Sequence, residues 1–83
     1  MSFFVYIIYS AILDQYYIGH SENLDDRLFR HRNSGSKATK KANDWILTYS
    51  EKFNTKAEAA SRELTIKKKK SREYIEWLIR SVG

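Results

Sequence analysis

The sequence predicts an α+β domain, a three-stranded, mostly antiparallel β-sheet flanked by helices in the order β-β-α-β-α-α. Residues 3–9, 16–18 and 45–53 are rich in the aromatic and β-branched residues that favour strands. A short polar link separates the first two segments and suits a hairpin. Residues that commonly start helices, Asn23 and Thr55, follow the second and third segments. We therefore expect a hairpin, a helix, a third strand and two further helices.

The first strand is expected to lie at the centre of the sheet. Both of its faces are largely apolar, with Phe3, Val5, Ile7 and Tyr9 on one and Phe4, Tyr6 and Ile8 on the other. A strand covered on two sides shows this pattern. Tyr6 is then a residue with a polar tip on a buried face, and Tyr17 of the second strand should lie near it. Taken alone, the two residues are best explained as core tyrosines whose hydroxyls bond to neighbours.

The first helix is expected to begin near Asn23 and to end near residues 33–35. Two aspartates follow Asn23 and suit the positive end of the helix dipole, while Asn and Gly close helices in the left-handed conformation. Arg27 and His31 are four residues apart and so project from nearly the same side. The spacing places a guanidinium and an imidazole beside the tyrosine-rich hairpin.

The polar segment 36–44 is expected to be a loop before the third strand. Its lysines, Lys37, Lys40 and Lys41, could contact phosphate groups. A solvated loop with no ligand explains the same composition equally well.

The second helix has the best-supported boundary of the chain. Thr55 and Glu58 form a capping box, so the helix should start here and run to about Lys70. Its apolar stripe is expected to contain Ala57, Ala60 and Leu64, with Ile66 at an edge.

Glu63 is expected to point toward the packed side of this helix, where a carboxylate needs a partner. An ion pair with Arg62, Lys67 or a residue of another element is the common explanation. A metal ion is the other. A last helix, with Ser71 as its cap and Ile75, Leu78, Ile79 and Val82 at helical spacing, should pack on the sheet, and Trp77 adds bulk.

Length and composition indicate a single domain that spans residues 1–83. The net charge of +5 favours polyanionic partners, and the absence of cysteine excludes disulfides, thiolate metal sites and cysteine nucleophiles. The N-terminal apolar run is too short to span a bilayer and lacks the flanks of a signal peptide, so we expect a cytoplasmic protein without a membrane contact. His20 is expected to be a surface residue and not a ligand.

A set of residues in order along the chain resembles the GIY-YIG nuclease domain. It consists of Val5-Tyr6-Ile7, Tyr17-Ile18-Gly19, Ser21, Leu24, Arg27, Leu28 and His31. The likeness is closest to small single-domain members similar to the N-terminal nuclease module of the bacterial excinuclease C subunit. Phe4-Val5-Tyr6 stands where the signature has Gly-Ile-Tyr, with the tyrosine retained. The resemblance continues through Glu63 to the C-terminal helix, although the last helix lacks the asparagine or lysine that several members carry.

This resemblance implies a metal-dependent endonuclease that hydrolyses DNA phosphodiester bonds, in repair, recombination or mobile-element processing. By analogy Tyr6 or Tyr17 would orient or activate water, Arg27 would contact the scissile phosphate, and His31 would assist proton transfer. Glu63 would bind a single Mg²⁺ or Mn²⁺, and the neighbouring Lys67 would contact phosphate. DNA, branched or damaged, is the expected partner, with no small-molecule cofactor.

Two other functions fit the same sequence. A nucleic-acid-binding module could keep the nuclease fold without cutting and depend on its lysines and arginines. A small interaction domain with an incidental basic surface is the weaker alternative.

Overall fold

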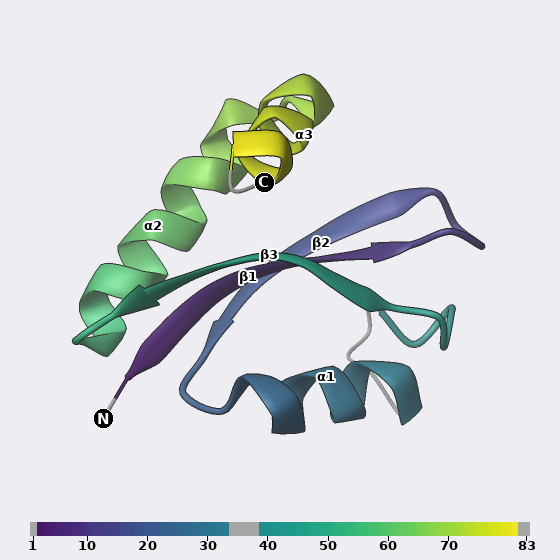
Figure 1. Cartoon of the computed structure of the whole chain (residues 1–83), viewed down its shortest axis with the longest axis horizontal. Helices are drawn as coiled ribbons and strands as arrows, with labels where there is room; N and C mark the ends of the chain where they lie inside the picture. The colour runs from purple at the N-terminus through teal and green to yellow at the C-terminus, as the bar shows by residue number, and fades with distance from the viewer. Residues whose placement is uncertain (1, 34–38, 82–83) are drawn as a thin grey trace.

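The chain forms a three-stranded sheet with α1 on one face and α2 and α3 on the other (Figure 1). This computed structural model describes residues 2–33 and 39–81. The predicted α+β class and the order β-β-α-β-α-α are confirmed. The elements are β1 (Phe3–Ser10), β2 (Gln15–Ser21), α1 (Leu24–Asn33), β3 (Ile46–Phe53), α2 (Lys56–Lys69) and α3 (Arg72–Ser81).

β1 is the central strand, as its two apolar faces predict. The strand order is β2-β1-β3, and β1 pairs antiparallel with both neighbours. In the β1–β2 register Tyr6 lies opposite Gly19, and Ile8 lies opposite Tyr17. Residues directly opposite each other share a face of the sheet. Tyr6 and Tyr17 are therefore on the same face.

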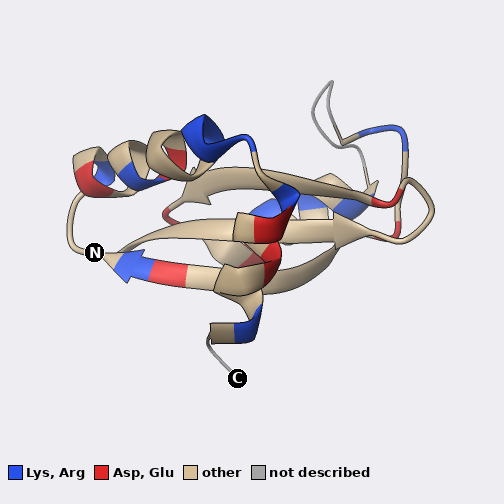
Figure 2. Ribbon diagram, turned by 90° about the horizontal axis from the view of Figure 1, so that it is seen from above, with Lys and Arg blue, Asp and Glu red and all other residues tan. Residues whose placement is uncertain are grey.

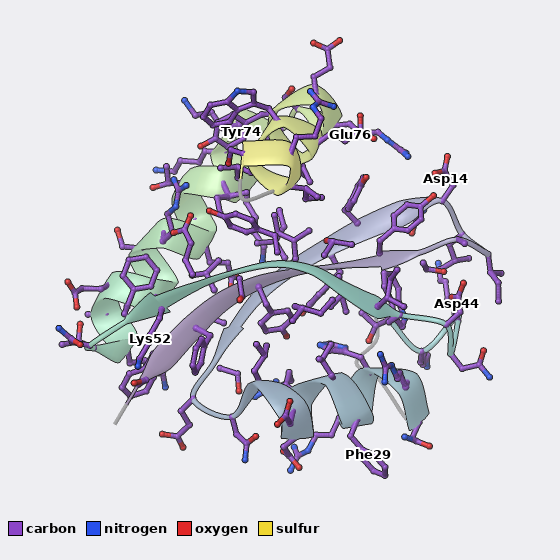
Figure 3. The ribbon with its side chains drawn as sticks, viewed as in Figure 1. Asp14, Phe29, Asp44, Lys52, Tyr74 and Glu76 are labelled. Carbon is purple, nitrogen blue, oxygen red and sulfur yellow. The ribbon has the colours of Figure 1, made fainter. Side chains whose placement is uncertain are left out.

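Each face of the sheet has its own apolar core. The face toward α2 and α3 buries Val5, Ile7, Ile18, Tyr49, Ala59, Ile66 and Leu78. The face toward α1 buries Tyr6, Ile8 and Trp45, with Leu24 and Leu28 packed against them. Phe29 points from α1 away from the sheet (Figure 3). The first core holds the helices that follow β3, and the second holds α1 under the tyrosines.

The helix starts are the ones that the sequence predicts. The side chain of Asn23 accepts a hydrogen bond from the Asp26 backbone N–H at 3.0 Å. At α2 the predicted capping box is present in both directions between Thr55 and Glu58. Ser71 Oγ accepts from the Tyr74 backbone N–H at 3.1 Å and caps α3.

The prediction of which residues form the apolar stripe of α2 is wrong. Leu64 is 57% exposed, and the helix buries Ala59 and Ile66 instead. The apolar residues near its N-terminus are alanines, which are too small to fix the rotation of the helix by burial alone. Ile66 and an ion pair to the sheet both contribute, because Ile66 is in the core and Arg62 binds Glu51 of β3 through two hydrogen bonds of 2.9 and 3.0 Å.

α3 packs on the sheet through Leu78, with Ile75 and Ile79 at the margin, as predicted, while Trp77 is exposed. Val82 lies outside the described residues. Among those residues, no helix is long and apolar enough to cross a membrane.

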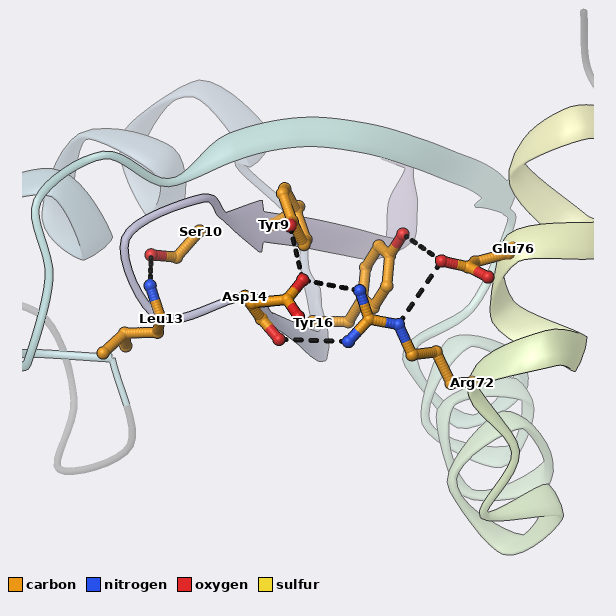
Figure 4. A network of polar contacts seen from close by, with 7 residues as sticks. All are labelled: Tyr9, Ser10, Leu13, Asp14, Tyr16, Arg72 and Glu76. Carbon is orange, nitrogen blue, oxygen red and sulfur yellow. Dashed lines mark hydrogen bonds and ion pairs between the residues drawn. The ribbon is translucent and has the colours of Figure 1, made fainter.

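A polar network joins the β1–β2 turn to the first turns of α3 (Figure 4). Arg72 donates to the Asp14 carboxylate at 2.6 Å and to the Asp14 carbonyl at 3.1 Å. The same guanidinium lies over the ring of Tyr16, and both residues donate to Glu76. This network fixes the outer end of β2 against α3.

Candidate active site

A buried chain of hydrogen bonds links the hairpin to α1. Tyr6 Oη lies 2.9 Å from His31 Nε2, and His31 Nδ1 lies 2.8 Å from Thr39 Oγ1. Tyr6 and His31 are 2% and 3% exposed. The imidazole therefore lies beside the tyrosines, as the helical spacing of α1 predicts, but it lies in the interior of the protein.

Burial determines which atom donates in each of these hydrogen bonds. Burial, and secondarily the charge of Arg27, lower the pKa of His31, so the imidazole is neutral at pH 7. A neutral imidazole donates from one nitrogen and accepts at the other. The Tyr6 hydroxyl has no other partner in the described structure, and leaving its O–H unsatisfied would cost about 1–3 kcal/mol. Tyr6 therefore donates to Nε2, and Nδ1–H donates to Thr39.

Gly19 makes room for the Tyr6 ring. A Cβ at this position would lie 2.5 Å from the Tyr6 hydroxyl oxygen and 2.7 Å from the ring carbon that carries it. The glycine of the Tyr17-Ile18-Gly19 triplet is thus required by the tyrosine of the opposite strand. Burial, with Tyr17 nearby, raises the pKa of Tyr6, so Tyr6 is a neutral phenol.

Tyr17 also contacts the imidazole of His31 but is more exposed than Tyr6. Its ring centroid lies 5.1 Å from that of His31, and its side chain is half-buried. Its hydroxyl bonds to none of the described residues. Of the two tyrosines, Tyr17 is the one whose hydroxyl is free to contact a reactant.

Glu63 faces the sheet, as predicted, and its two oxygens have different partners. Oε1 lies 2.7 Å from His20 Nδ1, and Oε2 lies 2.7 Å from Lys67 Nζ. Two of the predicted kinds of partner, Lys67 and a residue of another element, are therefore present, and Arg62 binds Glu51 instead. Burial would raise the pKa of Glu63, but the hydrogen bonds from Lys67 and His20 outweigh it and lower that pKa. Glu63 is a carboxylate at neutral pH.

His20 is the site residue that the sequence prediction missed. It was expected to be a surface residue, but its side chain is only 28% exposed and binds Glu63. Strand alternation was the available signal, because His20 must face the same side as Ile18, which packs with α2. Glu63 of α2, which is predicted to point toward the packed side of its helix, is a carboxylate that can pair with this histidine.

His20 and Arg27 line one small hollow together. We call it the Arg27 hollow; it measures about 230 Å³ and is lined by Phe3, His20, Ser21, Glu22, Arg27 and Lys56. The guanidinium of Arg27 is exposed and forms no hydrogen bond or ion pair with a described residue. Glu63 is not one of the lining residues, but it binds the lining residue His20.

The remaining predicted phosphate ligands are more scattered. Lys40 and Lys41 line a second hollow of about 270 Å³ together with His31 and Arg32. This hollow lies at the C-terminal end of α1. Lys67 stays at Glu63, and Lys37 lies outside the described residues. The predicted residues thus form three groups. The first is Arg27 in its hollow, with Glu63 behind His20; the second is the buried Tyr6–His31 pair; the third is the separate basic hollow with Lys40 and Lys41.

Comparison with known proteins agrees with this geometry. The GIY-YIG catalytic domain matches residues 2–75, nearly the whole chain. The chain belongs to the GIY-YIG family. It is therefore a member of a nuclease family, and its strands and helices have the order that the resemblance implied.

Two relatives of this GIY-YIG domain are also small proteins. A UPF0213 protein of Staphylococcus saprophyticus is 40% identical over 52 residues, which cover 61% of this chain and 63% of that protein, less than two thirds of its length. The solution NMR structure of a UPF0213 protein from Bacillus halodurans matches with a TM-score of 0.61 and 28% identity, over 100% of this chain and 87% of that one.

GIY-YIG nucleases generally use a divalent metal, and Glu63 is the carboxylate of the predicted site that could bind one. Within 2–33 and 39–81 no cluster of three or more His, Cys, Asp or Glu side chains could enclose an ion. Mg²⁺ does not need such an enclosure, because it keeps several waters and is held by one or two carboxylates together with substrate phosphates. A carboxylate has about four lone-pair sites, and His20 and Lys67 engage two of those on Glu63.

The neutral state of His31 predicts how stability depends on pH. Its folded pKa is below the unfolded value of about 6.5, so below that pH the unfolded chain binds more protons and stability falls as pH falls. We expect wild type to lose more stability than His31→Gln between about pH 7 and pH 5.5. Denaturant unfolding at both pH values measures this. The two proteins differ only at this residue, so equal losses would contradict a buried neutral His31.

Proposed function

We propose that this GIY-YIG domain is a metal-dependent endonuclease that hydrolyses DNA phosphodiester bonds. The observation that carries the proposal is the 2.7 Å hydrogen bond between His20 and Glu63, because His20 lines the Arg27 hollow. A carboxylate able to bind Mg²⁺ therefore lies directly behind one wall of the hollow that is also lined by Arg27, whose guanidinium has no partner among the described residues. Phosphodiester cleavage needs this combination, since charge accumulates on the phosphate oxygens in the transition state.

In the proposed mechanism Arg27 holds the scissile phosphate. Its planar fork matches two phosphate oxygens, and no ion pair with a described residue has to be broken first. A Mg²⁺ or Mn²⁺ held by Glu63 would neutralise charge on the phosphate and on the leaving oxygen.

Tyr17, and not Tyr6, is proposed to contact the attacking water. The Tyr6 hydroxyl is buried and already donates to His31, whereas that of Tyr17 has no such bond. His31 contacts both rings and holds them in place, and the proton that the attacking water loses passes to solvent, because no hydrogen bond between described residues connects Tyr17 to His31. Thr39 supports the other imidazole nitrogen.

The alternative function is a nucleic-acid-binding module that keeps the fold but does not cut. Two observations favour it: both Glu63 oxygens have protein partners, and the basic residues are spread over all three helices and the loop before β3 (Figure 2). Basic groups spread in this way suit phosphate contacts that do not depend on base sequence.

A nicking assay separates the two functions. Wild type is expected to nick supercoiled DNA in Mg²⁺ and not in EDTA. Arg27→Lys keeps the charge but loses one of two charge-assisted hydrogen bonds, so cleavage should fall about 10- to 100-fold, with DNA retention nearly unchanged. Retention of DNA without cutting in Mg²⁺ would select the binding module, and undiminished cutting by the variant would remove Arg27 from the mechanism.

We propose further that the protein is cytoplasmic and that it acts on DNA in repair or recombination. Parallel assays on linear, branched and damaged duplexes test that setting. Faster cutting of the branched or damaged forms would support it, and equal rates on all of them would contradict it.

A further inference from the structure

Lys56 lines the Arg27 hollow, yet neither the sequence motif nor the mechanism above uses it. It is the first residue of α2, it is exposed, and it faces the same space as Arg27 of α1 and His20 of β2. Its ammonium forms no hydrogen bond or ion pair with any residue that the structure describes. Two cations without a partner among the described residues therefore border one small hollow, and they come from different helices.

This position is electrostatically unfavourable for a lysine in the free protein. The N-terminus of a helix carries partial positive charge and favours anions, so a cation at the first position is destabilising. The capping box satisfies backbone N–H groups with Thr55 and Glu58, but neither residue pairs with the ammonium. Departures from such local preferences, here a cation at a helix N-terminus, are expected mainly at functional sites.

The hollow has little negative charge of its own to compensate. Glu22 is the one carboxylate among its lining residues, and no ion pair joins it to Arg27 or Lys56. Glu63, behind His20, is already bound by His20 and Lys67. An anion entering the hollow would meet two cations without protein partners, and would relieve their mutual repulsion.

The size and shape of the hollow indicate which anion. Its volume of about 230 Å³ is below the range of about 300–1,000 Å³ typical of sites that enclose drug-sized ligands, so it suits phosphate groups better than a nucleoside. A nucleic-acid strand offers phosphates in succession, and Arg27 already takes one of them in the proposed function.

We propose that Lys56 binds the phosphate next to the one held by Arg27, so that the hollow grips two consecutive phosphates of one strand. This inference rests on the proposed function and adds a substrate requirement to it. A charged phosphate must flank the bond that is cut. Lys56 is then a positioning residue that sets where along the strand the reacting bond lies, and it has no part in the chemistry.

The first test measures binding and stability without metal. Lys56→Gln should weaken binding to a short duplex and reduce the slope of log affinity against log salt by about 1, while Lys56→Arg keeps both at the wild-type level. The melting temperature of free Lys56→Gln should be unchanged or higher, because a cation leaves the helix N-terminus. An unchanged salt slope would overturn the proposal, and so would a clearly lower melting temperature, which would make Lys56 a structural residue.

The second test locates the phosphate. Once the cut position on a defined duplex is mapped, the phosphate on either side of it is replaced in turn by a neutral methylphosphonate. The control variant is Lys68→Gln, because Lys68 lies on the same helix but outside the hollow. One of the two replacements should slow cleavage by wild type and by Lys68→Gln. The same replacement should not slow cleavage by Lys56→Gln any further. Equal sensitivity in all three proteins would overturn the assignment. If wild type itself does not cut, the proposed function fails, and the metal-free binding test still decides the role of Lys56.

Discussion

Glu63→Gln is expected to abolish Mg²⁺-dependent nicking while the protein stays folded. Glutamine keeps the shape of the side chain and can still accept hydrogen bonds, but it lacks the charge that a hard divalent cation needs. The fold should tolerate the change because Lys67 is 48% exposed and can be solvated once its partner is lost. We expect a stability change within about 1 kcal/mol, as for other partly exposed ion pairs. Nicking in Mg²⁺, DNA retention and thermal unfolding on this one variant measure the three effects.

Glu51→Gln is the matched control for that experiment. Glu51 pairs with Arg62 through two hydrogen bonds and joins β3 to α2, away from the Arg27 hollow. Its replacement should lower stability, since a half-buried guanidinium loses its fork partner, and should leave nicking per folded molecule unchanged. If Glu63→Gln instead melts well below wild type and still nicks DNA, Glu63 is a structural ion-pair partner and not the metal ligand.

The element order of this chain could be predicted because its signals are local. Strand composition, the capping box at Thr55 and the cap at Asn23 each act within a few residues, and the structure confirms all of them. The contact between the tyrosines and His31 was also predictable, because helical spacing and hairpin pairing are regular.

The prediction failed where contacts between elements decide the outcome. The face of α2 that meets the sheet carries the buried Ala59 and Ile66. It also carries Arg62 and Glu63, whose partners Glu51 and His20 belong to the strands. No pattern within α2 contains those partners, so Leu64 was wrongly placed inside. His20 is a different case. Strand alternation places it on the side of Ile18, but only the packing of β2 against α2 brings it to Glu63.

Removing one hydroxyl at a time should separate the roles of the two tyrosines. Tyr17→Phe is expected to reduce cleavage by about 10²- to 10⁴-fold, the usual contribution of a residue that handles a proton or positions water. Its stability should change by less than about 0.5 kcal/mol, since the hydroxyl bonds to none of the described residues and the ring stays against His31.

Tyr6→Phe should lose more stability and less cleavage than Tyr17→Phe. It leaves the buried Nε2 of His31 without its donor, which costs about 1–3 kcal/mol and lowers the melting temperature by roughly 4–8 °C for each kcal/mol in a domain of this size. Its cleavage, measured well below the melting temperature, should fall less than that of Tyr17→Phe, because the Tyr6 hydroxyl is buried and does not reach the reactant. The two variants differ from wild type by one oxygen atom each, so nicking rates and thermal unfolding can be compared directly. Should Tyr6→Phe lose more cleavage than Tyr17→Phe at equal folded fraction, the water is activated through the buried tyrosine–histidine chain, and Tyr17 becomes the residue that only holds His31 in place.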